Sequence, residues 1–163
     1  CLFIDFSKAF DTINHPILFS KLQRLNLPPF IFSFIVNFLT GRTQAVTLNG
    51  KRSHFLPITQ SIVQGSGLGP SLYITYKSDL QLLSALNFLG LYADDLTVAT
   101  ALPSDLPIEF AHIQDWALLN LLTINLRKCN ELVFQRPNCR HDLLPQPLLD
   151  IQQVTSLKHL GLP

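Results

Sequence analysis

The stretch Leu91-Tyr-Ala-Asp-Asp-Leu-Thr-Val-Ala-Thr100 places two adjacent carboxylates, Asp94 and Asp95, inside an apolar run that is typical of a strand. Adjacent negative charges repel each other, and burying either of them without a partner is costly. Two interpretations are open from these residues alone. In the first, the pair lies in an exposed turn, because Asp tolerates turn geometry. In the second, both carboxylates converge on divalent cations such as Mg²⁺, which prefer oxygen ligands and remove the repulsion.

A third carboxylate in a similar position is Asp5, which follows the apolar run Leu2-Phe-Ile4. If the strand before Asp5 lies beside the hairpin that carries Asp94 and Asp95, three carboxylates share one end of a sheet. Two cations held there about 3.5–4 Å apart would stabilise the attacking and leaving oxygens of an in-line phosphoryl displacement. A cap or turn role for Asp5 is the alternative, and the sequence does not decide whether the two strands are neighbours.

The order of the expected elements predicts an α+β fold with an antiparallel sheet. Asn49-Gly50 predicts a tight hairpin between residues 43–48 and 52–59, because Asn-Gly suits a turn with positive φ. The other expected strands are 2–6, 87–93, 96–101, 131–135 and 156–160. The expected helices are one that begins near Asn14 and carries the stripe Leu18, Leu22 and Leu25, a buried one over 28–39, one over about 70–83, and one with the face Phe110, Ile113, Ala117, Leu121 and Ile124.

Length and composition predict one globular domain, since 47% of the residues are hydrophobic and 14% are charged. The most apolar run, 28–39, is too short to span a membrane, and we find no signal peptide. Three cysteines, Cys1, Cys129 and Cys139, have no paired metal spacing. We therefore expect reduced thiols in an intracellular protein, without a membrane or a disulfide-linked partner. The absence of Met and the start inside a strand-like run predict a piece of a longer chain.

Charge is unevenly distributed along the chain. The net charge is +4 over residues 1–60, −5 over 61–120 and +2 over 121–163. An acidic middle between basic flanks suits a cation site beside a polyanion, and a solvated charged face explains the pattern equally well.

A glycine-rich stretch, Gln64-Gly-Ser-Gly-Leu-Gly-Pro70, has the composition of a phosphate-binding loop. It lacks the Gly-Lys-Ser/Thr ending of a P-loop, and its glycine spacing differs from the dinucleotide fingerprint. By its pattern alone it is a flexible turn before a helix.

Three motifs nevertheless occur together and in order: Phe3-Ile-Asp-Phe-Ser-Lys-Ala-Phe-Asp11, Gln64-Gly-Ser66 with Leu68-Gly-Pro70, and Tyr92-Ala-Asp-Asp95. Together they resemble the core motifs of the reverse transcriptase of LINE-type (non-LTR) retrotransposons. The downstream series Trp116, Asn120, Leu122, Asn125 and Lys128 resembles the next segment of that family. Lys158-His-Leu-Gly161 resembles the start of its primer grip. The resemblance covers nearly the whole chain.

The resemblance implies a right-hand polymerase fold, in which residues 1–163 form the palm region, a sheet backed by helices, without fingers and thumb. Asp5, Asp94 and Asp95 match the catalytic carboxylates of the family. Asp5 and Asp94 would bridge two Mg²⁺ ions, for which Mn²⁺ substitutes, while Asp95 and the Phe6 carbonyl complete the metal shell. The implied reaction is RNA-directed DNA polymerisation, in which a DNA primer 3′-hydroxyl attacks the α-phosphate of a deoxynucleoside triphosphate on an RNA template.

Further residues match the nucleotide-binding positions of the family. The amides of Lys8 and Ala9 would face the triphosphate, and Phe10 would exclude a ribose 2′-hydroxyl. Gln64 and Gly65 would meet the incoming nucleotide and the template. The remaining matches are Lys128 as a candidate proton donor to pyrophosphate, and Leu160 and Gly161 in the primer grip. Apart from the resemblance, Arg42, Lys51 and Arg52 could contact nucleic-acid phosphates. For Phe10, Lys128 and the three basic residues, ordinary core or surface roles are the alternatives.

The sequence departs from the family pattern in several places. Ser61 and Val63 replace a glycine and a proline of the usual Gly-Val-Pro-Gln-Gly-Ser, and Gly67 replaces a larger apolar residue. Lys77 and Ser78 stand where an apolar residue and Asn are typical. These changes favour the alternative of a non-catalytic relic or nucleic-acid-binding module. An RNA-dependent RNA polymerase fits less well, because Phe10 would exclude ribonucleotides. An active enzyme would work in the nucleus or the cytoplasm.

Overall fold

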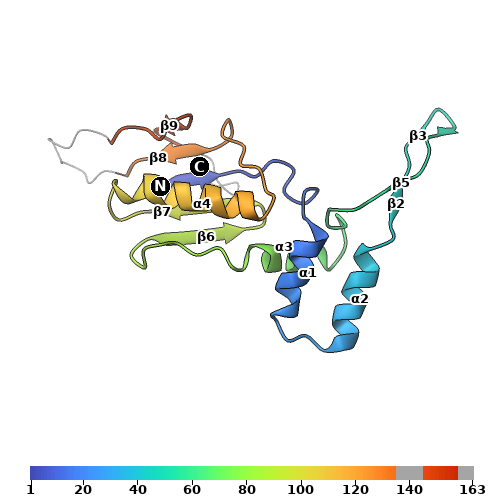
Figure 1. The fold of residues 1–163 in the computed structure, drawn as a ribbon. Helices are drawn as coiled ribbons and strands as arrows, with labels where there is room; N and C mark the ends of the chain where they lie inside the picture. Colours follow the sequence, from blue (N-terminus) through green and yellow to red (C-terminus); the bar gives the residue numbers. More distant parts are fainter. Residues whose placement is uncertain (135–144, 158–163) are drawn as a thin grey trace. The chain divides into compact units, whose positions relative to one another are not determined.

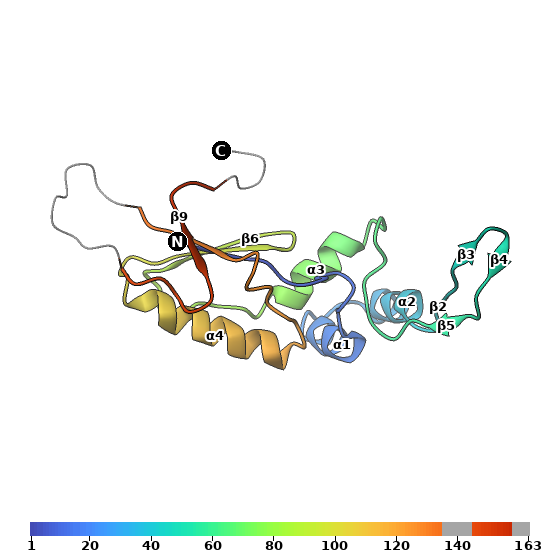
Figure 2. The same cartoon turned by 90° about the horizontal axis from the view of Figure 1, so that it is seen from above.

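The computed structural model describes residues 1–134 and 145–157, which fold into two compact units (Figures 1 and 2). The first, the sheet unit, combines Cys1–Ser7 with the chain from Leu80 onward. The second, the helical unit, is Lys8–Asp79. No helix among the described residues is long and apolar enough to cross a membrane.

A five-stranded sheet forms the framework of the sheet unit, in the order β6-β7-β1-β8-β9. Three neighbouring pairs in this sheet are antiparallel, as expected, but β8 and β9 run parallel, so the sheet is mixed. The strands are β1 (Leu2–Ile4), β6 (Phe88–Tyr92), β7 (Asp95–Ala99), β8 (Asn130–Leu132) and β9 (Gln152–Val154).

Helix α4 (Asp105–Leu119) covers one face of this sheet, as both views of the ribbon show. The covered face of the central strands carries Leu2, Ile4, Leu96 and Val98, which are all buried. Alternation along a strand turns every second side chain to this face, so the residues between them lie on the other face. Burial of the helix face Phe110, Ile113, Trp116 and Ala117 against the sheet supplies the core.

Helix α4 is shorter than its apolar pattern predicts. The helix ends at Leu119, and Leu121 adopts a positive φ of 54°, which stops the right-handed helix. Leu121 is exposed and Ile124 instead forms a β-bridge with Phe6, so extending the stripe to these two residues was wrong. Of the expected strand 156–160, residues 156 and 157 follow the end of β9 at Val154 and are not in a strand, and residues 158–160 lie outside the described residues.

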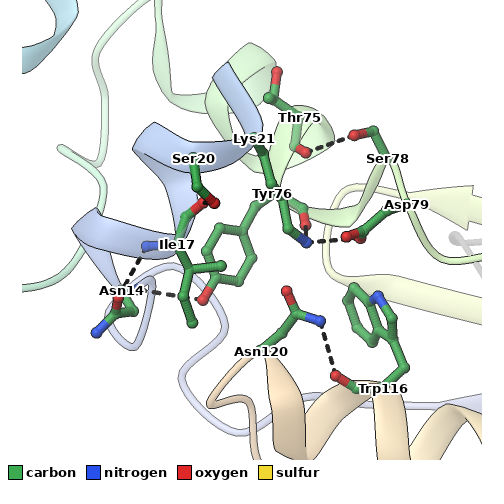
Figure 3. Close-up of polar contacts among 10 residues, drawn as sticks. All are labelled: Asn14, Ile17, Ser20, Lys21, Thr75, Tyr76, Ser78, Asp79, Trp116 and Asn120. Atoms are coloured by element: carbon green, nitrogen blue, oxygen red, sulfur yellow. Dashed lines mark hydrogen bonds and ion pairs between the residues drawn. The ribbon is translucent and has the colours of Figure 1, made fainter. Parts of the chain in front are cut away.

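The helical unit contains α1 (His15–Gln23), α2 (Pro29–Leu39) and α3 (Gly69–Lys77). Asn14 caps α1 as predicted, because its side-chain oxygen accepts the Ile17 amide. Lys21 fastens α1 to the end of α3, since its Nζ donates to the Tyr76 carbonyl at 2.5 Å and to Asp79 Oδ1 at 2.6 Å (Figure 3). Helix α3 ends at Lys77, earlier than predicted, where the Ser78 hydroxyl donates to the Thr75 carbonyl.

The prediction that residues 28–39 form a buried helix was right about the helix and wrong about its burial. Only Ile35 and Leu39 of α2 are buried, whereas Phe30 and Phe34 are more than half exposed. Leu25, assigned to the α1 stripe, lies beyond that helix and is also exposed.

The predicted hairpin forms a ribbon of four short strands. These are β2 (Thr43–Gln44), β3 (Thr47–Leu48), β4 (Lys51–Arg52) and β5 (Leu56–Pro57), with β2 paired to β5 and β3 to β4. Asn49 and Gly50 have positive φ angles of 50° and 75°, the geometry of a type I′ turn, as the Asn-Gly sequence indicates.

Candidate active site

Two of the predicted catalytic carboxylates lie side by side on the open face of the sheet unit. The β1–β7 ladder pairs Phe3 with Thr97 and Ile4 with Leu96, so one further step along this register sets Asp5 opposite Asp95. Both follow the alternation of their strands onto the face that α4 leaves uncovered. The Asp5 strand therefore lies beside the Asp94-Asp95 hairpin, an arrangement that the sequence left undecided.

A cleft of about 370 Å³ opens at this point of the sheet unit. Asp5 and Asp95 line it together with Lys128 and five residues of the flanking strands and loops: Phe3, Ile4, Leu96, Asn130 and Leu157. Asp5 Oδ2 is buried and has no hydrogen-bond partner among the described residues. Lys128 Nζ lies 3.7 Å from that oxygen, and three-quarters of the Asp5 side chain is shielded from solvent. A buried carboxylate oxygen whose nearest cation is 3.7 Å away suits a further positive charge.

Asp94 occupies the turn between β6 and β7 and is exposed. Tyr92 pairs with Asp95 across a two-residue turn, and Ala93 adopts a positive φ of 47°. The residues that the structure describes contain no group of three or more His, Cys, Asp or Glu side chains close enough to hold a metal ion. The structure thus brings Asp5 and Asp95 together, while a shared site that includes Asp94 stays a prediction.

The segment after α4 positions Lys128. The Asn125 amide donates to the Asp5 carbonyl at 2.8 Å, and the Ser7 amide donates to the Thr123 carbonyl at 2.8 Å, which fixes this segment against β1. The amides of Lys128 and Cys129 then donate to the Asn125 carbonyl and form a turn. This turn directs the chain at Lys128 back toward Asp5. Asp5 and Ser7, on either side of Phe6, form the backbone hydrogen bonds to this segment. In an antiparallel pair the residue between two such residues has its carbonyl on the other side of the strand, so the Phe6 carbonyl points away from this segment.

Cys129 is a structural thiol in the same turn. Burial raises the pKa of the Cys129 thiol and outweighs the opposing effect of the Asp5 backbone. The thiol is therefore neutral at physiological pH, and its Sγ donates to the Asn125 carbonyl at 3.3 Å.

The predicted nucleotide-binding residues gather within the helical unit. Phe10 stacks on Tyr73 with ring centroids 4.5 Å apart, and its carbonyl accepts the Ile62 amide at 2.9 Å. This contact brings the Phe10 turn to the Gln64-Gly65 loop. Lys8 begins the turn with a φ of 49°, and its carbonyl accepts the Asp11 amide at 2.8 Å, while Ala9 is buried.

Asp11 is a residue that the sequence reasoning did not single out. Its Oδ1 accepts a hydrogen bond of 2.9 Å from Gln64 Nε2, so the carboxylate fixes the direction of the glutamine side chain. The sequence feature that could have indicated Asp11 was its position in the same motif as Phe10. Of the other predicted residues, Lys51 and Arg52 are exposed on the ribbon and Arg42 is partly buried before it. Leu160 and Gly161 lie outside the described residues.

Comparison with known proteins identifies the family. Residues 1–163 match the protein family described as "Reverse transcriptase (RNA-dependent DNA polymerase)". The chain belongs to the reverse transcriptase family. The resemblance to non-LTR retrotransposon enzymes predicted from the motifs is confirmed, since related sequences come from such elements.

Two related proteins come from Drosophila melanogaster. The RNA-directed DNA polymerase from mobile element jockey is 34% identical over 145 residues, which cover 81% of this chain and 16% of the relative. The probable RNA-directed DNA polymerase from transposon X-element is 31% identical over 82% of this chain and 16% of its own length. The Pol polyprotein of retrotransposable element R2 from Popillia japonica is 25% identical over 77% of this chain and 23% of its own. The reverse transcriptase chain thus spans a small part of the curated relatives that it matches.

Proposed function

We propose that the chain is the palm region of an RNA-directed DNA polymerase from a non-LTR retroelement, in which Asp5, Asp94 and Asp95 are the catalytic carboxylates. The proposal is carried by one observation: Asp5 and Asp95 line one cleft on the open face of the sheet, where Asp5 Oδ2 is buried without a hydrogen-bond partner among the described residues. In this proposal the enzyme acts inside the cell, in the nucleus or the cytoplasm.

The donor set at this cleft fits a hard divalent cation, because carboxylate oxygens are the ligands that Mg²⁺ prefers. Asp5, Asp94, Asp95 and the Phe6 carbonyl would hold two Mg²⁺ ions, or Mn²⁺ in their place. Bound there, the ions supply positive charge to the triphosphate and favour ionisation of the primer hydroxyl.

The chain's own residues would orient the substrates. The 3′-hydroxyl oxygen of a DNA primer attacks the α-phosphorus of a deoxynucleoside triphosphate paired to an RNA template, and the bond to pyrophosphate breaks. Lys128, whose Nζ lies 3.7 Å from Asp5, would give a proton to the departing pyrophosphate. Lys8, Ala9, Gln64 and Gly65 would contact the nucleotide, and Asp11 would hold the Gln64 amide in one orientation.

Phe10 would set the preference for deoxynucleotides. Its ring is held by stacking on Tyr73, so it cannot easily turn aside for a ribose 2′-hydroxyl. In a complete enzyme, Phe10→Ala would admit ribonucleotides, and unchanged sugar selection would remove this role.

Binding of Mn²⁺ to purified 1–163 tests the carboxylate assignment without requiring turnover. We expect loss of the free Mn²⁺ electron paramagnetic resonance signal on titration, and Asp5→Asn or Asp95→Asn should weaken binding at least tenfold. Asp115→Asn on α4, which removes an exposed carboxylate outside the cleft, is the matched control. Equal binding by all four proteins would refute the assignment.

We also propose that the 163-residue chain alone has little or no polymerase activity, since it spans 16% of relatives such as the jockey polymerase. Primer extension on an RNA template should stay at background. Extension that Asp94→Asn abolishes would overturn this statement and would support the catalytic carboxylates.

A second candidate function, a nucleic-acid-binding relic without chemistry, is favoured by Ser61. This residue replaces a glycine of the family pattern and has a φ of 95°, which side chains rarely adopt. A relic would bind RNA while failing to bind Mn²⁺ at the cleft.

A further inference from the structure

The ribbon of the helical unit, residues 43–57, carries its side chains almost entirely in solvent. Both ribbon views show it extending away from α2, within the same unit (Figures 1 and 2). Val46 and Leu48 are each 71% exposed, and Phe55 is 61% exposed. An isolated two-stranded hairpin is marginal in water, and exposed apolar residues gathered on one element mark an interaction surface.

A bulge in this ribbon creates an unusual pair of side chains. Two residues, Ala45 and Val46, separate the ladders on one arm, whereas three residues, 53–55, separate them on the other. The Val46 amide donates to Ser53 Oγ at 2.9 Å and stabilises the bulge. Residues three apart in a regular strand face opposite ways, but here the Arg52 guanidinium carbon lies 5.9 Å from the centre of the Phe55 ring.

The charge along this part of the chain is uniformly positive. Between Asp11 and Asp79 the sequence has no Asp or Glu. The ribbon and its base carry Arg42, Lys51 and Arg52 over the same stretch. A second copy of the ribbon would bring like charges together, whereas a polyanion would neutralise them.

We propose that this ribbon binds single-stranded nucleic acid, with a base stacked on the Arg52–Phe55 pair and phosphates beside Lys51 and Arg52. An exposed aromatic ring beside a guanidinium is the surface on which unpaired bases stack, and a basic groove or ribbon follows the backbone. Stacking needs an unpaired base, so the proposal specifies single strands over duplex. It uses the proposed function only in taking nucleic acid as the partner, and it requires no metal and no chemistry.

Fluorescence anisotropy with a 5′-fluorescein-labelled 20-nucleotide RNA, a DNA of the same sequence and the corresponding duplex tests the proposal on the 163-residue chain. Arg52→Gln should weaken single-strand binding about tenfold at low salt and reduce the slope of log K against log salt by about 0.7, because one phosphate contact is lost. Phe55→Leu should weaken binding about fivefold or more with no change in slope, because only stacking is lost.

Matched controls separate these effects from general ones. Arg24→Gln removes the same charge from an exposed position at the end of α1, and Phe30→Leu makes the same change at a ring on α2 that is 71% exposed, against 61% for Phe55. Both controls should bind like the unaltered chain. All the altered residues are exposed, so circular dichroism should show unchanged folding.

Several outcomes would overturn the proposal. One is an equal loss of RNA affinity in Phe30→Leu and Phe55→Leu. Another is tighter binding of the duplex than of the single strands. The third is a change of self-association in sedimentation, caused by ribbon substitutions that leave RNA binding unchanged. Because the readout is binding, loss of Mn²⁺ binding or polymerase activity would leave it standing, so the two proposals fail separately.

Discussion

At the scale of single residues, Ser61 is held in a conformation that suits glycine. Its amide donates to the Ile13 carbonyl at 2.9 Å, and His15 Nε2 lies 2.8 Å from its carbonyl oxygen, so both backbone groups are fixed at a φ of 95°. A side chain in this region costs about 1–3 kcal/mol. The sequence shows that Ser61 departs from the glycine of the family pattern. The structure shows the consequence, which is a side chain on a backbone with positive φ.

We therefore predict that Ser61→Gly stabilises the chain by about 1 kcal/mol, because relief of strain exceeds the added freedom of the unfolded chain. Urea unfolding followed by circular dichroism measures the change. Ser20→Gly is the control with the opposite sign, since Ser20 lies inside α1 and glycine lowers helix stability by about 0.5 kcal/mol relative to serine. A destabilising Ser61→Gly would show that the positive φ carries no strain.

At the scale of elements, the sequence predicted what depends on local chemistry. Asn14 and Asn49-Gly50 act on their immediate neighbours, so the start of α1 and the hairpin turn were predicted correctly. The neighbouring positions of Asp5 and Asp95 depend instead on the pairing of β1 with β7, which the sequence left undecided.

Other features depend on contacts that no local pattern encodes. Three examples are the exposure of Phe30 and Phe34, the parallel pairing of β8 with β9, and the contact of Asp11 with Gln64. The nucleotide-binding assignments rested on family resemblance alone, and they stay predictions.

Glu109 illustrates an element held by a buried charge. It is 1% exposed on α4, and it accepts the amides of Leu83 and Ser84 at 2.9 Å and Asn87 Nδ2 at 2.8 Å, which anchors the loop before β6. Burial acts to raise the pKa of Glu109, but these hydrogen bonds outweigh it and hold the pKa below the ordinary 4.5.

We predict that Glu109→Gln destabilises the sheet unit by about 1–3 kcal/mol, because the amide nitrogen of Gln would face a donor. A depressed carboxyl pKa stabilises the fold above the unfolded value, and this contribution is lost as pH falls through the folded value. The difference between the two proteins should therefore be full at pH 7 and shrink below about pH 4.5.

Urea unfolding of both proteins at several pH values measures this difference. Asp115→Asn removes a carboxylate from an exposed position on the same helix and should change stability by less than about 0.5 kcal/mol at each pH. A Glu109→Gln deficit that stayed constant down to pH 3 would assign the effect to packing rather than to the charge.

At the scale of the whole molecule, the chain is divided into two compact units, each with its own core. The sheet unit packs α4 on the sheet, and the helical unit joins α1 to α3 through Lys21, Tyr76 and Asp79. Local stability follows cooperative units of this kind, and amide hydrogen exchange measures it region by region.

We accordingly predict reciprocal patterns of hydrogen exchange in two variants. Glu109→Gln should speed exchange in β6, β7 and α4 while α1 and α3 keep their protection, because the lost hydrogen bonds lie within the sheet unit. Lys21→Met should do the reverse, since it removes the bonds to Tyr76 and Asp79 within the helical unit. Mass spectrometry of peptic peptides at pH 7 compares the two. Faster exchange throughout the chain in either variant would mean that both units open together, and the two cores would then count as one cooperative structure.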